Sequence, residues 1–323
     1  TSEMKIPKSI KIKKCRLCKN PKLKQIYNFG NHYVSNFVNK ASIHKGIKAP
    51  LNLVYCNKCH LLQLEHSAPQ EIMYKKFYWY RSGVTSTMRN ALKDIYKSSL
   101  KNINIHKDDV VLDIGANDGA LLKYFRDKNF KTIGCEPAKN LTSKLKKNCN
   151  YVLNDYWSYK KLNKILKEKK LKKPKIITAL GMFYDLENPN KFIKDSALAL
   201  DEKGIFIAQL MCFKSMIDKN DIGNICHEHL EFYSLKSLKY LFENNGMEIF
   251  KIEENDINVN EGDYDDRYPL HIAVDEKSYE CIEILIKTGA TIDVKDRWVA
   301  ILMGSPDGDH PHSKYADHIP IRK

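Results

Sequence analysis

The stretch from Val110 to Gly119, which reads VVLDIGANDG, constrains the fold of this chain more than any other. Its first three residues are apolar and rich in β-branched side chains, which is typical of a buried parallel strand. Asp113 ends that strand, and Gly115 and Gly119 permit a tight turn in which the backbone can approach a ligand closely. We expect a helix to follow directly. A strand, a glycine loop and a helix N-terminus in this order form a cradle for a small molecule.

The position of the acid indicates which ligand this cradle takes. Asp113 precedes the glycines and the chain has no GxGxxG there, which disfavours a dinucleotide and favours S-adenosylmethionine (SAM), whose amino group is cationic. A second predicted strand, residues 130–136, ends at Glu136, 23 residues after Asp113. This interval suits a carboxylate that accepts hydrogen bonds from both ribose hydroxyls. Each motif alone is compatible with an ordinary turn after a strand, and the two together favour SAM.

Two further strand ends are expected at the same site. Residues 151–153 form a third strand, after which Asn154 and Asp155 could reach the adenine. A fourth strand ends at Leu180, and the loop 181–185 lies at its carboxyl end, where α/β sheets bind ligands. The predicted cofactor-binding residues are Asp113, Gly115, Asn117, Gly119, Glu136, Asn154, Asp155 and Leu180. A helix at 191–200, a strand at 204–209, a helix at 235–245 and a strand at 247–253 complete the predicted domain of residues 108–258.

Two CxxC motifs precede this domain. Cys15 and Cys18 are separated from Cys56 and Cys59 by 37 residues, which suggests a small module over residues 1–68 with short strands at 26–30 and 51–55. Four thiolates complete a tetrahedral zinc site and leave no open position, so the zinc is expected to be structural. The nine cysteines of the chain suit a reducing compartment and a metal better than a disulfide framework. A helical connector with an aromatic cluster is expected over residues 69–107.

The segment His227-Glu228-His229 places two imidazoles and a carboxylate within three residues. In an extended segment the two histidines would share one side. The spacing excludes HExxH, and three alternatives remain: a metal triad, an ordinary surface loop, and an acid/base pair. The acid/base pair is favoured because imidazole titrates near neutrality and a carboxylate can orient it.

The charge distribution suggests a boundary near residue 255. The chain carries a formal charge of +15, of which residues 1–255 contribute +21 and residues 256–323 contribute −6. The basic excess is mostly Lys spread along helix faces, without aromatic interleaving, which favours a solvated surface over a nucleic-acid site. The sequence shows neither an apolar run of membrane-spanning length nor a signal peptide, so a cytoplasmic protein is expected.

Five motifs together resemble a known family, the zinc-containing SAM-dependent sugar C-methyltransferases. They are the paired CxxC motifs, YWYRSG at 78–83, DIGANDG at 113–119, MFYD at 182–185 and CHEH at 226–229, in that order over about residues 13–258. The resemblance implies a zinc module, a Rossmann-like SAM domain and methylation of a carbon beside a ketone on a nucleotide-linked deoxysugar. It further implies that His229 is the general base, that Glu228 orients it or stabilises the enol, and that the Tyr80 hydroxyl lies near the reacting centre. Better-known members carry Tyr where this chain has Cys226.

The chain departs from that family after Asn258. The family continues into a second α/β domain that supplies much of the sugar-nucleotide site, whereas residues 259–298 here resemble an ankyrin repeat. One repeat cannot bury its apolar face alone, so this segment packs on the core, pairs with a protein partner or is poorly ordered. The tail 299–323 is rich in His and Asp, which suits either metal binding or a disordered polar tail.

The expected fold class is therefore α/β, a Rossmann-like SAM methyltransferase core between a small N-terminal zinc-binding module and a C-terminal ankyrin-like helical hairpin. The expected function is C-methylation of a nucleotide sugar or similar keto substrate. The alternatives are a catalytically impaired SAM-binding scaffold with an ankyrin-type interaction segment, and a methyltransferase of another substrate class.

Overall fold

The computed structural model describes residues 9–34, 46–75, 78, 80–218 and 222–252. The chain divides into two compact units, one formed by residues 1–82 and 92–252 and the other by residues 83–91 and 253–323. Of the second unit only residues 83–91 are described, and they include the beginning of helix α1 (Ser86–Asn102). The predicted ankyrin-like segment and the tail lie outside the described residues. Among the helices of the described ranges, none combines the length and the apolarity that crossing a bilayer requires.

A five-stranded parallel sheet forms the centre of the first unit. Its strand order is β10-β9-β6-β7-β8. The strands are β6 (Val110–Ile114), β7 (Lys131–Cys135), β8 (Tyr151–Leu153), β9 (Pro174–Leu180) and β10 (Ile205–Gln209). All five residues of β6 are buried, as the apolar run predicts. The strand order reverses between β6 and β9, and open α/β sheets bind ligands outside the carboxyl ends of the strands at such a point.

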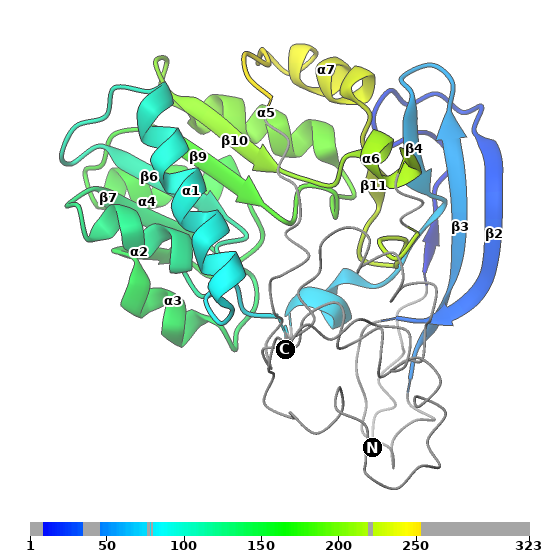
Figure 1. Ribbon diagram of the computed structural model, residues 1–323, viewed down its shortest axis with the longest axis horizontal. Coiled ribbons are helices and arrows are strands. Elements are labelled where there is room, and N and C mark those ends of the chain that lie inside the picture. Colours follow the sequence, from blue (N-terminus) through cyan, green and yellow to red (C-terminus); the bar gives the residue numbers. More distant parts are fainter. Residues whose placement is uncertain (1–8, 35–45, 76–77, 79, 219–221, 253–323) are drawn as a thin grey trace, which may run out of the picture. The chain divides into compact units, whose positions relative to one another are not determined.

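Helices connect the parallel strands and cover both faces of the sheet (Figure 1). They are α2 (Ala120–Arg126), α3 (Thr142–Asn148), α4 (Tyr159–Glu168) and α5 (Pro189–Ala199). Right-handed crossovers place α2 and α3 on one face and α4 and α5 on the other, because the chain reverses its direction across the sheet after β8. The predicted Rossmann-like core is confirmed.

A second, antiparallel sheet carries the cysteine motifs. Its strand order is β11-β4-β3-β2, with β2 (Lys24–Tyr33), β3 (Lys48–Cys56), β4 (Leu61–Leu64) and β11 (Glu231–Phe232). A small two-stranded sheet pairs β1 (Ile10–Lys11) with β5 (His66–Ser67). The strands expected at 26–30 and 51–55 are thus confirmed and extended. Strand β11 comes from the far end of the first unit, so the sheet of the cysteine module is completed by a segment more than 160 residues away.

Two local expectations are wrong. The region 69–107 is not one helical connector, since a single turn of π-helix (Glu71–Lys75) is followed by irregular backbone at residues 80–81 before α1 begins. The strand expected at 247–253 does not form within the described residues 247–252. The chain there follows helix α7 (Leu235–Glu243) and exposes Phe250 and Ile252 to solvent, and it pairs with none of the strands in the described residues. The short helix α6 (Phe213–Asp218) was not predicted.

Candidate functional site

The predicted cofactor residues meet at one edge of the parallel sheet. Strands β6, β7, β8 and β9 all end there, and the glycine loop is fastened across them. The backbone N–H of Gly115 donates to the Cys135 carbonyl at 2.8 Å, and the N–H of Glu136 donates to the Leu153 carbonyl at 3.0 Å. Parallel strands all end at the same edge of a sheet. Residues that directly follow such strands in the sequence therefore lie close together in space.

Both glycines of the loop adopt backbone angles that other residues rarely adopt. Gly115 has φ +75° and Gly119 has φ +79°. A Cβ on Gly115 would lie 2.7 Å from Cγ of Met182, and a Cβ on Gly119 would lie 2.9 Å from both Asn148 and Leu145 of α3. The glycines therefore permit both the turn and the close approach of the segments on either side.

Asp113 lines a small cavity. The cavity is lined in part by Ser82, Asp113, Gly115 and Leu180. Asp113 is 5% exposed and accepts a 2.6 Å hydrogen bond from the Thr178 hydroxyl. Burial raises the pKa of Asp113 to about 7, the Thr178 hydrogen bond opposes this shift, and the charge of Glu136 adds to it. A cationic group placed in this cavity would favour the ionised carboxylate.

Glu136 is buried and its carboxylate is fixed by two backbone amides. Oε2 accepts from the N–H of Asn117 at 2.9 Å, and Oε1 accepts from the N–H of Ala138 at 2.8 Å. Burial raises the pKa of Glu136, and these two amide hydrogen bonds oppose the shift. Each carboxylate oxygen accepts more than one hydrogen bond, so the fixed carboxylate retains acceptor sites for ribose hydroxyls.

Asn117 has a role that the sequence did not suggest. Its side-chain oxygen accepts from the N–H of Ser82 at 3.1 Å, and its amide donates to the Tyr80 carbonyl at 3.0 Å. Asn117 was predicted to bind the cofactor, and that role stays a prediction. In the structure it fastens the segment of Tyr80 to the glycine loop, while its backbone N–H holds Glu136.

The two residues expected near the adenine differ in what holds them. Asn154 donates to the Glu136 carbonyl at 2.7 Å, which keeps its side chain beside Glu136. The Asp155 carboxylate is paired with Lys161, and this hydrogen bond lowers the pKa of Asp155. Asp155 is therefore engaged by a neighbour on α4, and a role toward the adenine stays a prediction.

The His-Glu-His segment forms a turn, and its two histidines have different partners. Nε2 of His227 lies 2.9 Å from the Ala49 carbonyl on β3, and the residue is 3% exposed. Nδ1 of His229 lies 2.7 Å from the Asn224 carbonyl. The condition under which both histidines would share one side is not met, because the backbone turns at 226–228 and is not extended. His227 ties the turn to the cysteine module.

His229 is held as a neutral imidazole. A carbonyl only accepts, so the Nδ1 atom carries the hydrogen and Nε2 carries the lone pair. Burial lowers the pKa of His229, while the Asn224 carbonyl and the charge of Glu228 oppose the shift. The Tyr184 ring packs edge-on against the imidazole, with 4.7 Å between ring centroids.

The loop after β9 supplies residues beyond the predicted set, and one of them, Tyr184, contacts this imidazole. The backbone carbonyl of Tyr184 accepts from the N–H groups of Leu230 and Glu231, at 2.8 and 3.0 Å, so the loop after β9 lies beside the turn. Burial raises the pKa of Asp185, and the charges of Glu231 and Glu228 add to the shift. The motif MFYD at 182–185 had indicated that this loop belongs to the site. Nothing in the motif distinguished Tyr184 and Asp185 from residues that only pack.

Glu228 and Cys226 complete the turn. The Glu228 carbonyl accepts from the Tyr74 hydroxyl at 3.1 Å, whereas its buried carboxylate atom Oε2 has no hydrogen-bond partner within the described ranges. Burial, followed by the charge of Glu228, raises the pKa of Cys226 to about 12, so this thiol stays protonated at neutral pH. Tyr80 is 37% exposed.

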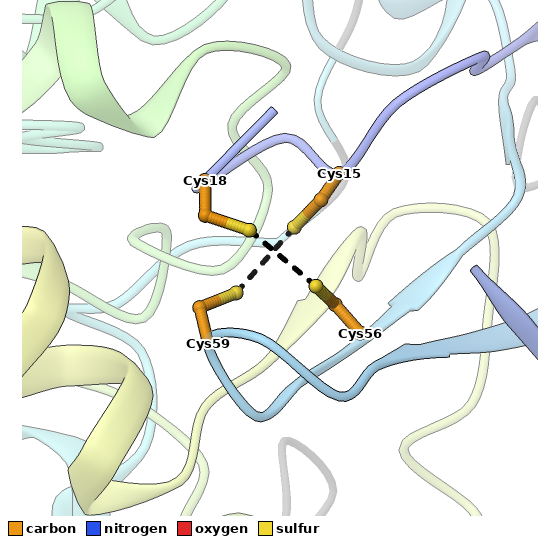
Figure 2. A group of neighbouring side chains, drawn as sticks. All are labelled: Cys15, Cys18, Cys56 and Cys59. Atoms are coloured by element: carbon orange, nitrogen blue, oxygen red, sulfur yellow. Dashed lines mark hydrogen bonds between the residues drawn. The ribbon is translucent and has the colours of Figure 1, made fainter. Parts of the chain in front are cut away.

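The four cysteines converge on one point, from two knuckles of the same shape (Figure 2). Their sulfur atoms all lie within 4.8 Å of one another, with Cys15 and Cys59 at 3.5 Å and Cys18 and Cys56 at 3.4 Å. A tetrahedral site with Zn–S bonds of about 2.3 Å requires sulfurs about 3.8 Å apart, so the cluster fits zinc. Among the described residues, no other group of three or more His, Cys, Asp or Glu side chains could hold a metal ion. A metal triad at 227–229 is therefore disfavoured.

Surrounding amides support the thiolate form of this cluster. Gln63 donates through Nε2 to Sγ of Cys15 at 3.2 Å, and Asn20 donates to Sγ of Cys56 at 3.5 Å. The two motifs also share a backbone conformation, because the residue after the second cysteine of each, Lys19 or His60, has φ +59°. N–H groups directed at sulfur stabilise negative charge on a metal ligand.

Comparison with known families decides what this assembly is. A family model described as a methyltransferase domain matches residues 84–252, just over half of the chain. The chain belongs to the methyltransferase-domain family. A second model, of a zinc binding domain, matches residues 15–74, and an ankyrin repeat model matches residues 265–297. The expected zinc-binding, methyltransferase and ankyrin parts of the chain are thereby confirmed.

Individual relatives are distant. The C-methyltransferase NovU of Streptomyces niveus is 21% identical over 248 residues, which cover 76% of this chain and 58% of that protein. The chain thus spans less than two thirds of the length of this curated relative. Among solved structures, the cyclopropane synthase MmaA2 of Mycobacterium tuberculosis is 12% identical with a TM-score of 0.42, covering 68% of this chain and 82% of that one. The magnesium protoporphyrin IX methyltransferase ChlM of Synechocystis, with bound SAH, is 11% identical with a TM-score of 0.40, covering 54% and 78%.

The cofactors follow from the family and from the residues. SAM is the cofactor of the methyltransferase domain, and the glycine loop with Asp113 and Glu136 has the chemistry to hold it. Zinc is the ion of the four-cysteine cluster, whose sulfur spacing fits it.

Proposed function

We propose that this chain is a SAM-dependent C-methyltransferase whose substrate carries a ketone beside the methylated carbon, in the class of nucleotide-linked keto-deoxysugars. The observation that carries the proposal is the His229 imidazole. It is held through Nδ1 by the Asn224 carbonyl, so that Nε2 is the basic atom, and the residues after it are hydrogen-bonded to Tyr184 in the loop that follows β9. The distant likeness to a C-methyltransferase supports the same reaction class.

His229 is the base in this proposal. A ketone acidifies the adjacent C–H group, and Nε2 of His229 accepts that proton while the carbon becomes part of an enolate. Because burial disfavours the imidazolium, the ring stays neutral and ready to accept a proton at neutral pH. The Nδ1 hydrogen bond fixes the ring orientation, and the Tyr184 ring packed against it restricts rotation.

The other predicted residues bind and orient. SAM, when bound, supplies an electrophilic methyl group to the carbon nucleophile. Glu136 would hold the ribose hydroxyls and Asp113 would face the cationic amino group. The buried Oε2 of Glu228 offers an acceptor for a substrate hydroxyl or for the enol. Tyr80, whose segment is held to the glycine loop by Asn117, would offer a hydroxyl donor.

The test is proton exchange rather than turnover alone. The wild-type protein with SAM analogue bound should exchange the C–H beside the ketone of a nucleotide-linked keto-deoxysugar for deuterium, followed by NMR in deuterated water. His229→Asn retains an amide that can donate to the Asn224 carbonyl and lacks the basic nitrogen, so exchange should fall by at least 10²-fold, the usual contribution of a general base. His106→Asn, at an exposed histidine, is the matched control. Equal exchange in wild type and His229→Asn would contradict the assignment of the base.

A second candidate is a SAM-binding protein that does not turn over such sugars. It is favoured by the ankyrin match at 265–297. At this place the resembled family carries its second α/β domain, which supplies much of the sugar-nucleotide site. In this case SAM would raise the melting temperature of the chain, since a ligand that binds only the folded state stabilises it. No keto-sugar would then exchange its proton, and the ankyrin segment would instead hold a protein partner.

A further inference from the structure

A buried ion pair outside the proposed base and cofactor residues joins the two parts of the first unit. Nε of Arg16 lies 3.7 Å from Oε1 of Glu231, and the two side chains are 2% and 0% exposed. Arg16 stands between Cys15 and Cys18 on the first zinc knuckle, whereas Glu231 follows the His229 turn on β11. Burying two charged side chains costs free energy. If these two positions served only to fill the core, a pair of apolar side chains would do so at lower cost.

On the zinc side, the position of Arg16 depends on the knuckle. Gln63 donates through Nε2 to the Cys15 sulfur at 3.2 Å. The side-chain oxygen of the same Gln63 accepts from the backbone N–H of Arg16 at 3.1 Å and from its Nη1 at 3.4 Å. The Arg16 guanidinium also donates to the Leu64 carbonyl and to the Ser67 hydroxyl. A change in the position of Cys15 would therefore move Gln63, and with it the Arg16 side chain.

On the other side, Glu231 holds the loop that contacts the base. Its Oε2 accepts from the N–H of Leu186 at 3.2 Å. Its own N–H and that of Leu230 donate to the carbonyl of Tyr184, whose ring packs against His229. The contacts from Cys15 through Gln63, Arg16 and Glu231 thus reach the Tyr184 loop without touching Asp113 or Glu136.

We propose that Arg16 and Glu231 are positioning residues that couple the four-cysteine zinc site to the loops carrying Tyr184 and His229. Bound zinc would fix the conformation of the first cysteine motif, and this conformation orients the Arg16 side chain. Arg16 in turn holds the Glu231 carboxylate where it accepts the hydrogen bond from the Tyr184 loop. The catalytic consequence rests on the proposed function, whereas the coupling itself does not. SAM binding lies outside this path and is unaffected by it.

Amide hydrogen exchange of the full chain tests the coupling without a substrate. We compare the wild type, Arg16→Met and Lys19→Met, each with zinc and after removal of zinc by a chelator. Lys19→Met is the matched control, because Lys19 is an exposed cation on the same knuckle whose ammonium donates to the Arg16 carbonyl. In the wild type and in Lys19→Met, zinc removal should speed exchange at Leu230 and Glu231 by about tenfold, the change expected when the local structure loses about one intramolecular hydrogen bond.

In Arg16→Met this exchange should already be fast with zinc bound and should no longer respond to zinc. The coupling is refuted if zinc removal changes the exchange of Leu230 and Glu231 equally in all three proteins. It is equally refuted if Val111 and Leu112 of β6 lose protection together with them, because the link would then be general unfolding.

A second variant guards against a failure of Arg16→Met to fold. Glu231→Gln keeps an acceptor for the Leu186 N–H and removes only the charge that faces Arg16. It should retain zinc and bind SAM within about twofold of the wild type. Its substrate deuterium exchange should be slower by 10- to 100-fold, the range seen when outer-shell partners are lost. A wild type without substrate exchange would contradict the proposed function and leave the amide-exchange test standing, whereas unchanged exchange in Glu231→Gln would overturn the positioning role alone.

Discussion

Substituting Gly119 by alanine tests whether the glycine loop is held by its contact with α3 as well as by its backbone angle. Gly119 has φ +79° and stands at the start of α2. A Cβ there would lie 2.9 Å from Cβ of Asn148 and 2.9 Å from Cδ1 of Leu145. Asn148 is itself tied to the loop, because its amide donates to the Asp118 carbonyl at 2.7 Å. The helix therefore cannot move away without losing that bond.

Gly246 provides the matched control for the backbone term. It has φ +80°, and no atom of the described residues lies within 4 Å of a Cβ built on it. Placing alanine in a left-handed conformation costs about 1–2 kcal/mol, and the loss of unfolded-state freedom offsets about 0.4–1 kcal/mol of this. We expect Gly246→Ala to lower the free energy of unfolding by about 1 kcal/mol. Overpacking adds about 1–3 kcal/mol at a crowded site, so Gly119→Ala should lower it by about 3 kcal/mol.

Equilibrium unfolding in urea measures both variants against the wild type. The expected difference of about 2 kcal/mol between them is a large fraction of the stability of an ordinary domain. Equal losses in the two variants would refute the role assigned to the contact with α3. A larger loss in Gly246→Ala would refute the whole comparison.

Three further predictions concern protons and metal. Because burial lowers the pKa of His229, the acid limb of substrate deuterium exchange should lie below pH 6.5, and a limb above that value would contradict the buried neutral base. With the pKa of Asp113 raised to about 7, its carboxylate ionises as the pH rises from 6 to 8, so the affinity for cationic SAM measured by calorimetry should increase about tenfold; Asp113→Asn should abolish this dependence. Cys15→Ser should reduce the bound zinc measured by atomic absorption and lower the melting temperature, whereas Cys212→Ser, at an exposed cysteine, should change neither.

The sequence by itself determined the elements whose signals are local. The buried strand β6, the two loop glycines and the start of α2 follow from adjacent residues, because backbone sterics and apolar runs act over short distances. The zinc site of the four cysteines is equally predictable from the sequence, because two CxxC motifs with thiolate ligands fit few sites other than a structural zinc site. The meeting of Asp113 and Glu136 at one edge also follows, since parallel strands end on the same side.

Only the tertiary structure decided which side chains act together. Two histidines two residues apart have different partners, because His227 meets a carbonyl of β3 while His229 meets a carbonyl of its own loop. Asn117 turned out to fasten the Tyr80 segment, and β11 joined a sheet begun more than 160 residues earlier. These outcomes depend on contacts between segments far apart in the chain, and a side chain's direction is set by the partners it meets and not by its neighbours in sequence.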